Sequence, residues 1–298
     1  MTKNQEKIQE ALSRIDQGLA SIETDEDWLK FLRFQAQFYR YSFGNQMLIY
    51  LQCPEATFVK GFKAWNKLGR FVKRGEKGIM ILAPCISKIE TFKEPENQAE
   101  YHDEKAEKEV RNVIKGFRAA YVYDLCQTDG DDSQLPVLIT GLAGDGDTEH
   151  EIYERIKAAI SKHHNVTETE TGPKGVYNIE TTDISVRADL SDVQKIKSLL
   201  HEYAHCIDFY LHPDKDISRN RRELIAESVA YVVSMSLGID TSPYTTGYLK
   251  TWMTEKDELK AVADTVQKVS MKIIDELAGS DDPAFFMLKE EKEETDAD

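Results

Sequence analysis

The segment from 196 to 211 most constrains what this chain can fold into. Its apolar residues recur at intervals of three and four: Ile196, Leu199, Leu200, Tyr203, Ile207, Tyr210 and Leu211. That period predicts a helix with a packed face. Within the segment, the sequence HEYAH places His201 and His205 four residues apart. Side chains at this spacing lie on one face of a helix, one turn apart, so the segment brings two imidazoles together in a packed region.

Two imidazoles so placed suit a tetrahedral zinc ion, and Glu202 beside them can take a proton from water. A His2Glu set needs one further carboxylate from a neighbouring helix. The segment RRELIAESVAYVV supplies Glu223 and Glu227 among apolar residues, so at least one carboxylate should point inward. A buried acid without a partner is unfavourable, and a metal ion removes that penalty. The alternative is a buried helix with hydrogen-bonded histidines and two glutamates on a solvated face.

A basic and aromatic segment, residues 58–78, is the second informative feature. The formal net charge of the chain is −15, which argues against general nucleic-acid affinity and requires any such site to be local. The segment contains a single acidic residue, Glu76. It contains seven cationic residues: Lys60, Lys63, Lys67, Arg70, Lys73, Arg74 and Lys77. Phe58, Phe62, Trp65 and Phe71 are interleaved with them.

Sites for single-stranded nucleic acid combine cations along the backbone with rings on which bases stack. The seven cations and Trp65 are therefore the candidate DNA-binding residues, whereas Phe58 and Phe62 are expected in the core. The alternative is a solvated helix and hairpin whose aromatic residues are all buried.

The remaining pattern predicts helices and strands in the first part of the chain. Two helices are expected within residues 4–41, with Thr24 as an N-cap. RFVKRGEKGIMILAP is expected to form a hairpin that turns near Gly75 and Gly78. The charged stretch 91–113 is expected to be a solvated excursion between two strands.

An α+β fold in two domains is expected from the order of these elements. The first domain covers residues 1–128, and a linker rich in Gly, Asp and Pro follows at 129–146. The second domain, 147–280, begins with a helix and short strands and continues with helices. Residues 281–298 are expected to form an acidic, disordered tail.

Composition indicates the cellular setting. Membrane spans need runs of roughly 18 apolar residues, and the sequence has none. Its first residues lack the pattern of a secretory signal, and no two cysteines form a CxxC pair. These features predict a cytoplasmic protein with reduced thiols and no membrane partner.

Several stretches resemble a known family. YSFGNQMLIYL, ATFVKGFKAWNKLGRFVKRGEKGI and YVYDLCQTDG resemble the N-terminal domain of ArdC antirestriction proteins and of LtrC-like proteins of conjugative elements. LLHEYAHCIDF, RRELIAESVAYVV and GYLKTWMTEKDELKAVADTVQKVSMKIIDEL resemble the zinc metallopeptidase domain of that family. HEYAH and AESVAY are also similar to the ImmA/IrrE peptidases. The resemblance covers residues 5–278.

The resemblance implies an N-terminal domain that binds single-stranded DNA and a C-terminal zincin-like metallopeptidase domain with Zn²⁺. His201 and His205 match the metal ligands of the family, and Glu202 matches its catalytic base. Glu227 falls where the ImmA/IrrE-like motif has its ligand, and Glu223 falls where other His2Glu peptidases have theirs. Glu227 is thus the expected ligand, with Glu223 as its outer partner or as an alternate ligand.

The function expected from the resemblance is protection of single-stranded DNA from restriction during conjugative transfer, together with peptidase activity on an unidentified protein. Two alternatives remain. One is a regulatory zinc peptidase that cleaves a repressor and uses DNA binding only for localisation. The other is a non-enzymatic DNA-binding protein with structural zinc, in which replacing Glu202 would leave DNA protection unchanged.

Overall fold

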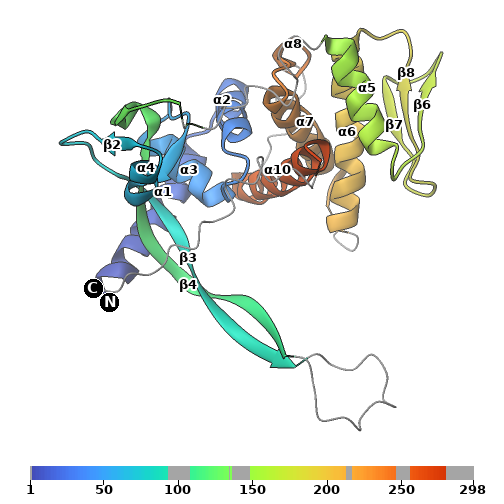
Figure 1. Ribbon diagram of the computed structural model, residues 1–298. Coiled ribbons are helices and arrows are strands. Elements are labelled where there is room, and N and C mark those ends of the chain that lie inside the picture. Colours follow the sequence, from blue (N-terminus) through green and yellow to red (C-terminus); the bar gives the residue numbers. More distant parts are fainter. Residues whose placement is uncertain are drawn as a thin grey trace.

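The fold is known from a computed structural model that describes residues 2–92, 108–133, 135, 148–212, 217–245 and 256–279. Within these residues the chain has the mixed α+β composition expected from the sequence, with helices packed around three small sheets (Figure 1). The predicted acidic tail at 281–298 lies outside the described residues.

The two helices expected within residues 4–41 form. They are α1 (Lys3–Ala20) and α2 (Asp25–Gln37), and α3 (Phe43–Gln52) follows them. Thr24 is the N-cap of α2: its hydroxyl accepts a bond from the Asp27 N–H (3.1 Å), and the Asp27 carboxylate accepts one from the Thr24 N–H (3.1 Å). This reciprocal pair satisfies two amides that a helix start leaves unpaired.

A long antiparallel hairpin dominates the first sheet. β3 (Ile79–Phe92) pairs with β4 (Lys108–Asp124), and β4 pairs on its other side with the short β1 (Val59–Gly61). The β3–β4 hairpin projects from the body of the molecule as an arm (Figure 1). Strand structure therefore reaches into both ends of the predicted 91–113 excursion, while residues 93–107 lie outside the described part of the chain.

The inner part of the β3 edge is covered by amide side chains of α3. Asn45 donates to the Leu82 carbonyl (3.0 Å) and accepts from the Leu82 N–H (2.8 Å). Gln52 does the same at Met80, at 2.9 Å for both bonds. Each amide thus replaces a neighbouring strand at one residue, which both protects the edge and fixes α3 against the sheet.

The hairpin predicted after residue 70 is wrong. β2 (Arg70–Val72), which follows α4 (Phe62–Lys67), pairs antiparallel with β5 (Thr128–Gly130) and not with β3. A turn does occur at Gly75, whose φ is +93°, but it redirects the chain instead of joining two paired strands. The partner strand comes from the predicted linker, beyond a 3-10 turn at Leu125–Gln127, so local turn signals could not identify it.

The second part of the chain packs helices against a small sheet. β6 runs parallel to β8 and β7 runs antiparallel to it, in the order β6-β8-β7. Its elements, in chain order, are α5 (Glu149–Ile160), β6 (Val166–Thr169), β7 (Gly175–Tyr177), β8 (Ile184–Arg187), α6 (Asp192–Leu211), α7 (Arg219–Ser236), α8 (Ser242–Thr245) and α10 (Lys256–Leu277). None of the helices described is long and apolar enough to cross a bilayer.

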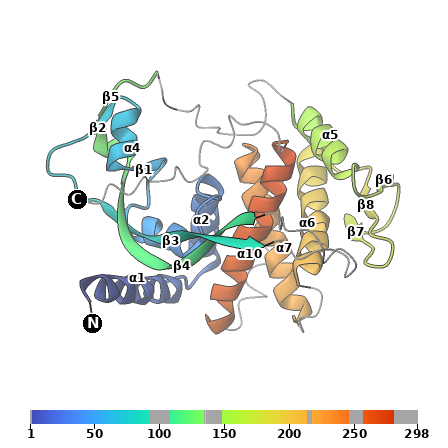
Figure 2. The ribbon, with the colours of Figure 1, turned by 60° about the horizontal axis from the view of Figure 1, so that its bottom comes forward.

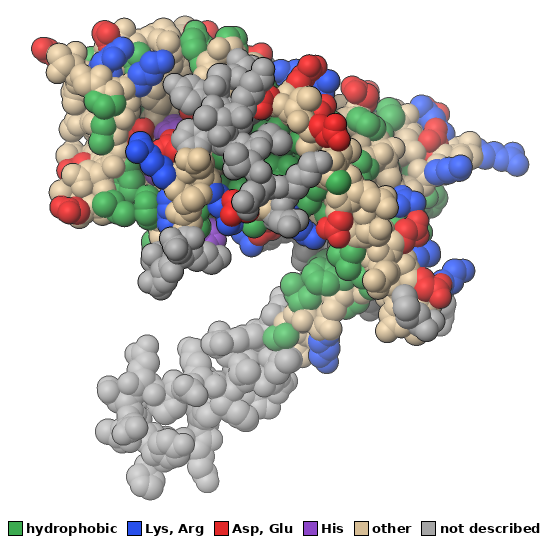
Figure 3. Space-filling model, turned by 180° about the vertical axis from the view of Figure 1, so that it is seen from behind, with side chains coloured by type: hydrophobic (Ala, Val, Ile, Leu, Met, Phe, Trp, Pro, Cys, Tyr) green, Lys and Arg blue, Asp and Glu red, His purple; other side chains and the backbone are tan. Residues whose placement is uncertain are grey.

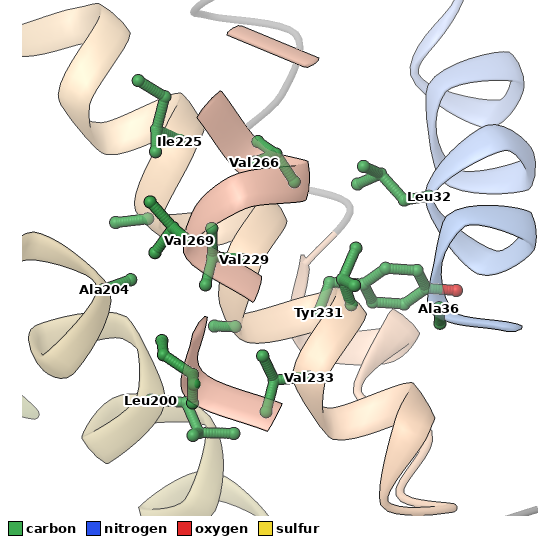
Figure 4. Close-up of a cluster of buried hydrophobic side chains, with 14 of the residues drawn as sticks. Leu32, Ala36, Leu200, Ala204, Ile225, Val229, Tyr231, Val233, Val266 and Val269 are labelled. Carbon is green, nitrogen blue, oxygen red and sulfur yellow. The ribbon is translucent and has the colours of Figure 1, made fainter. Parts of the chain in front are cut away.

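Helix α7 lies at the centre of the main core. It packs against α6, α10 and α2, and α10 lies between the N-terminal helices and the α6–α7 pair (Figure 2). Leu200 of α6, Val266 of α10 and Leu32 of α2 all meet around α7 (Figure 4). The buried Trp28 indole also donates to the Ser228 hydroxyl (3.1 Å). One hydrophobic cluster therefore joins both parts of the chain, and the division at 129–146 stays a prediction.

Candidate functional site

The two histidines of HEYAH lie together on α6. Ser191 caps this helix and accepts a bond from the Gln194 N–H (3.4 Å), so the helix begins at Asp192, nine residues before His201. The His201 and His205 Nε2 atoms are 3.2 Å apart, and both side chains are largely buried. The helical spacing therefore gives the convergence that the sequence predicted.

Glu223 brings a carboxylate to the same point from α7. Its Oε2 atom is 3.4 Å from His201 Nε2 and 3.8 Å from His205 Nε2. One nitrogen or oxygen atom from each of the three residues lies within 4.8 Å of the others. Because α6 and α7 pack directly against each other, the core fixes the separation of these three groups.

Glu227 contacts the opposite nitrogen of His201. Its Oε1 atom is 3.4 Å from His201 Nδ1, and its Oε2 atom is 2.8 Å from Lys197 Nζ. Lys197 also donates to the Tyr244 carbonyl (2.8 Å). The expected ligand, Glu227, therefore does not lie where the two imidazoles converge. Glu223 lies there, one helical turn before Glu227 on α7.

Glu202 is held against the edge strand β7. The Tyr177 backbone N–H donates to its carboxylate, and a Cβ added at Gly175 would lie 2.8 Å from Glu202 Cγ and Oε1. Burial raises the pKa of Glu202, although the two nearby imidazoles lower it. A carboxyl group in such a setting can accept and return a proton.

The charges around the histidines are strongly coupled. Burial by itself lowers the pKa of His201, but Glu223, Glu227 and Glu202 raise it, and the net shift is upward. Hydrogen bonds from His201 and His205 hold the pKa of Glu223 well below its usual range. The carboxylates therefore favour positive charge at the point where the two Nε2 atoms meet.

Most cations of the basic segment are exposed. Lys63, Lys67, Lys73, Arg74 and Lys77 are exposed, and Lys60 is half-buried. Lys and Arg side chains project on the side of the molecule that carries β2 (Figure 3). Among these residues, Lys73 donates to the Cys126 carbonyl (2.9 Å) and lies 3.7 Å from Asp129.

Trp65 and Arg70 are structural, which corrects their prediction as DNA-binding residues. The Trp65 ring is fully buried, and its indole donates to the Tyr123 carbonyl (2.8 Å). Arg70 is 7% exposed; it donates to the Thr128 hydroxyl (2.9 Å) and forms an ion pair with Asp132. Neither side chain presents its aromatic or cationic group to solvent.

The exposed rings of this region are others. Phe58 is buried as predicted, but Phe62, expected in the core, is 53% exposed, and Phe71 is 61% exposed. Tyr121 on β4 is 44% exposed and was missed. The alternation of Tyr121, Val122 and Tyr123 is the signal that could have found it, because a buried valine between two tyrosines turns both outward from that core face.

Comparison with known proteins identifies the N-terminal segment. Residues 4–123 match the family model of the N-terminal domain of anti-restriction factor ArdC. The expected resemblance to the ArdC antirestriction family is therefore confirmed over these residues.

Longer matches are more distant. An uncharacterized protein of Bacillus anthracis is 24% identical over 306 residues, which cover 90% of this chain. The chain spans about half (51%) of the length of that relative. A metal-free crystal structure of antirestriction protein ArdC from the R388 plasmid is 19% identical, with a TM-score of 0.46 over 80% of this chain and 85% of that one. The Mn(II)-bound structure of the same protein is also 19% identical, with a TM-score of 0.44 over 81% of this chain and 90% of that one.

Proposed function

We propose that this protein binds single-stranded DNA and carries a zinc-dependent peptidase centre of the HExxH type. The observation that carries the peptidase part is the convergence of His201, His205 and Glu223 beside the buried Glu202. Two imidazoles and a carboxylate from adjacent helices form a donor set typical of catalytic zinc, which keeps its fourth position for water or substrate.

The distances between the three groups fit a zinc ion. With zinc–nitrogen bonds of about 2.0–2.1 Å and tetrahedral angles, neighbouring ligand atoms lie roughly 3.3 Å apart. The three separations among His201, His205 and Glu223 are 3.2, 3.4 and 3.8 Å. These residues would hold the ion, which when bound supplies a Lewis acid that polarises a carbonyl and acidifies water.

The remaining side chains have roles that follow from their contacts. Glu202 accepts a proton from the attacking water and delivers it to the leaving amine, a cycle that its raised pKa favours. Glu227 Oε1 lies 3.4 Å from His201 Nδ1, so its charge favours a proton on that nitrogen, which would leave Nε2 to bind the metal. Lys197 Nζ lies 2.8 Å from Glu227 Oε2 and helps to hold the Glu227 side chain in this position.

Metal analysis of the purified protein tests the centre. We expect about one zinc per chain in the parent and in Glu202→Gln, because Glu202 is not a proposed ligand. The His201→Ala, His205→Ala double variant should lose the metal, and full occupancy there would refute the site. Glu202→Gln should also abolish proteolysis or self-cleavage. Equal cleavage by this variant and the parent would remove Glu202 from the mechanism.

DNA binding is the second part of the proposal. It is supported by the ArdC N-terminal domain match and by the exposed cations at the end of β2 and beyond. For single strands, the slope of log affinity against log salt changes by about 0.7 per phosphate contact. Replacing Lys73 and Arg74 together by Ala should flatten it by roughly 1 to 1.5 if both contact phosphates.

A matched pair controls for the loss of two charges. Lys162 and Lys174 are also exposed but belong to the other part of the chain, so their double Ala variant should keep the parental slope. An unchanged affinity and slope in the Lys73→Ala, Arg74→Ala protein would show that this pair contacts no DNA.

The biological role that we propose is protection of incoming DNA from restriction in the cytoplasm during conjugative transfer. The alternatives make different predictions. A regulatory peptidase would cleave one specific repressor protein, whereas a purely structural zinc would leave DNA protection intact in Glu202→Gln. A restriction-protection assay with that variant tests the structural-zinc alternative, and detection of cleavage of one specific partner protein would favour the regulatory peptidase.

A further inference from the structure

Two tyrosines of β4 lie on the same face of its hairpin. Tyr121 and Tyr123 are two residues apart, and the pairing of β3 with β4 is regular from Ile79 opposite Val122 to Cys85 opposite Gly116. Side chains of alternate strand residues share a face, and their Cα atoms are about 6.8 Å apart. Val122 between them is 6% exposed and packs in the core on the opposite face.

Phe62 continues this line of rings onto α4. Its ring centroid is 6.3 Å from that of Tyr123, at an interplanar angle of 68°. Both Phe62 and Tyr121 expose large aromatic side chains to solvent: Phe62 is 53% exposed and Tyr121 is 44% exposed. α4, β1 and β4 pack against one another, so rings from two segments of the chain form one row. We call Phe62, Tyr123 and Tyr121 the aromatic row.

Gly78 leaves the space that the row needs. A Cβ at this position would lie 2.9 Å from Tyr121 Cβ and 3.2 Å from the Tyr123 ring carbon Cζ. Any other residue would push against both tyrosines at once. The choice of glycine here therefore supports a defined placement of the two rings, in addition to their alternation along β4.

Two lysines lie beside the aromatic row, and the acidic residue that follows it on β4 is buried. Lys7 of α1 lies over the Tyr121 ring, 5.0 Å from its centroid, and Lys60 of β1 is paired in register with Tyr123. Asp124, the next residue of β4, is 1% exposed and accepts bonds from the Thr57 and Phe58 N–H groups (2.7 and 3.0 Å). Positive charge is thus presented beside the rings, and the nearest carboxylate along β4 is turned inward.

We propose that the aromatic row is the surface on which bases of single-stranded DNA stack. Exposed rings flanked by cations are the combination that such sites use, because every base has a face that can stack and every linkage has a phosphate. The row takes the role that the sequence suggested for Trp65. This inference rests on the proposed DNA binding and names the residues that carry it.

Removing the rings while keeping apolar side chains tests the inference. In the full chain, the Phe62→Leu, Tyr121→Leu double variant should bind a fluorescent oligothymidylate more weakly, by about 5- to 150-fold for each base that loses its ring. The salt dependence should stay parental because no phosphate contact is removed. Tyr121→Phe should bind as the parent does, since the ring remains.

Controls separate stacking from folding. Tyr210 on α6 is 75% exposed and lies in the other part of the chain, so Tyr210→Leu should leave affinity unchanged. Melting temperatures of all variants should match the parent, because the replaced rings are exposed. If the parent binds and the double variant binds equally well, the inference is overturned while DNA binding stands. If the parent binds no single-stranded DNA, the proposed DNA binding fails and the row fails with it.

Discussion

The two glutamates of α7 should contribute to metal affinity in very different degrees. Glu223 reaches both Nε2 atoms, at 3.4 and 3.8 Å, so Glu223→Gln removes a charged ligand. Of the two imidazoles, Glu227 contacts that of His201, at Nδ1 (3.4 Å), and acts on the metal through that ring. Loss of such an outer partner typically weakens binding about 10- to 100-fold, which is about 1.4–2.7 kcal/mol. We expect Glu227→Gln in this range and Glu223→Gln well beyond it.

The stability of the metal-free protein should rank the two variants in the opposite order. Glu227 and Lys197 are 9% and 11% exposed, and breaking a buried ion pair costs about 3–5 kcal/mol. In Glu227→Gln, the Gln side chain can still accept a hydrogen bond from Lys197, and the Tyr244 carbonyl also still accepts one from it. We therefore expect the free energy of unfolding to fall by about half of this cost or less. Glu223 is 26% exposed, and its replacement should cost less.

Chelator competition measures the affinities, and urea unfolding of the metal-free proteins measures the stabilities. Glu227→Asp is a useful third variant, because it keeps the charge but shortens the reach to His201. The assignment would be reversed if Glu227→Gln lost the metal while Glu223→Gln kept the parental affinity. Glu227, the ligand implied by the family resemblance, would then be the third ligand.

Two further predictions concern folding. Trp65→Ala should destabilise the protein by about 3–5 kcal/mol, because it removes a fully buried ring and the bond to the Tyr123 carbonyl, and a urea transition unchanged from the parent would refute its structural role. Hydrogen bonds from Lys157 and Lys195 lower the pKa of Glu168 to about 2, so its stabilising effect should be complete above the ordinary pKa near 4.5 and be lost as the pH falls toward 2. Glu168→Gln should remove that part of the acid dependence of urea midpoints between pH 2 and 6, and parallel curves for both proteins would contradict it.

The sequence predicts the histidine pair well because helical geometry alone places it. His201 and His205 share a face in any α-helix, and the apolar residues around them show that the face is packed. The third group depends on how α7 docks on α6. Glu223 and Glu227 also share a face, and periodicity does not say which turn of α7 lies opposite His201. Only the packing of the two helices determines that.

The basic segment shows a different limit of sequence-based inference. Its charge is evident from composition, and most of its cations are exposed as predicted. Arg70 differs because β2 pairs with β5, a strand that follows 56 residues after β2 and brings Thr128 and Asp132 to the guanidinium. A non-local pairing of three-residue strands leaves little local signal. Trp65 likewise depends on a distant segment, because its buried indole donates to the carbonyl of Tyr123 on β4.

The helix that carries Glu223 and Glu227 is supported by the N-terminal part of the chain. Trp28 of α2 is fully buried and donates to Ser228, the residue next to Glu227. Leu32 and Ala36 continue this contact along α2 toward Tyr231 (Figure 4). α7 therefore takes its position from α2 and α10 as well as from α6, and a small displacement of α7 would change the distance between Glu223 and the two imidazoles. α2 contributes Leu32 to the cluster around the metal centre proposed here and Phe34 to the cluster beside the DNA-binding segment, so destabilisation of α2 should reach both.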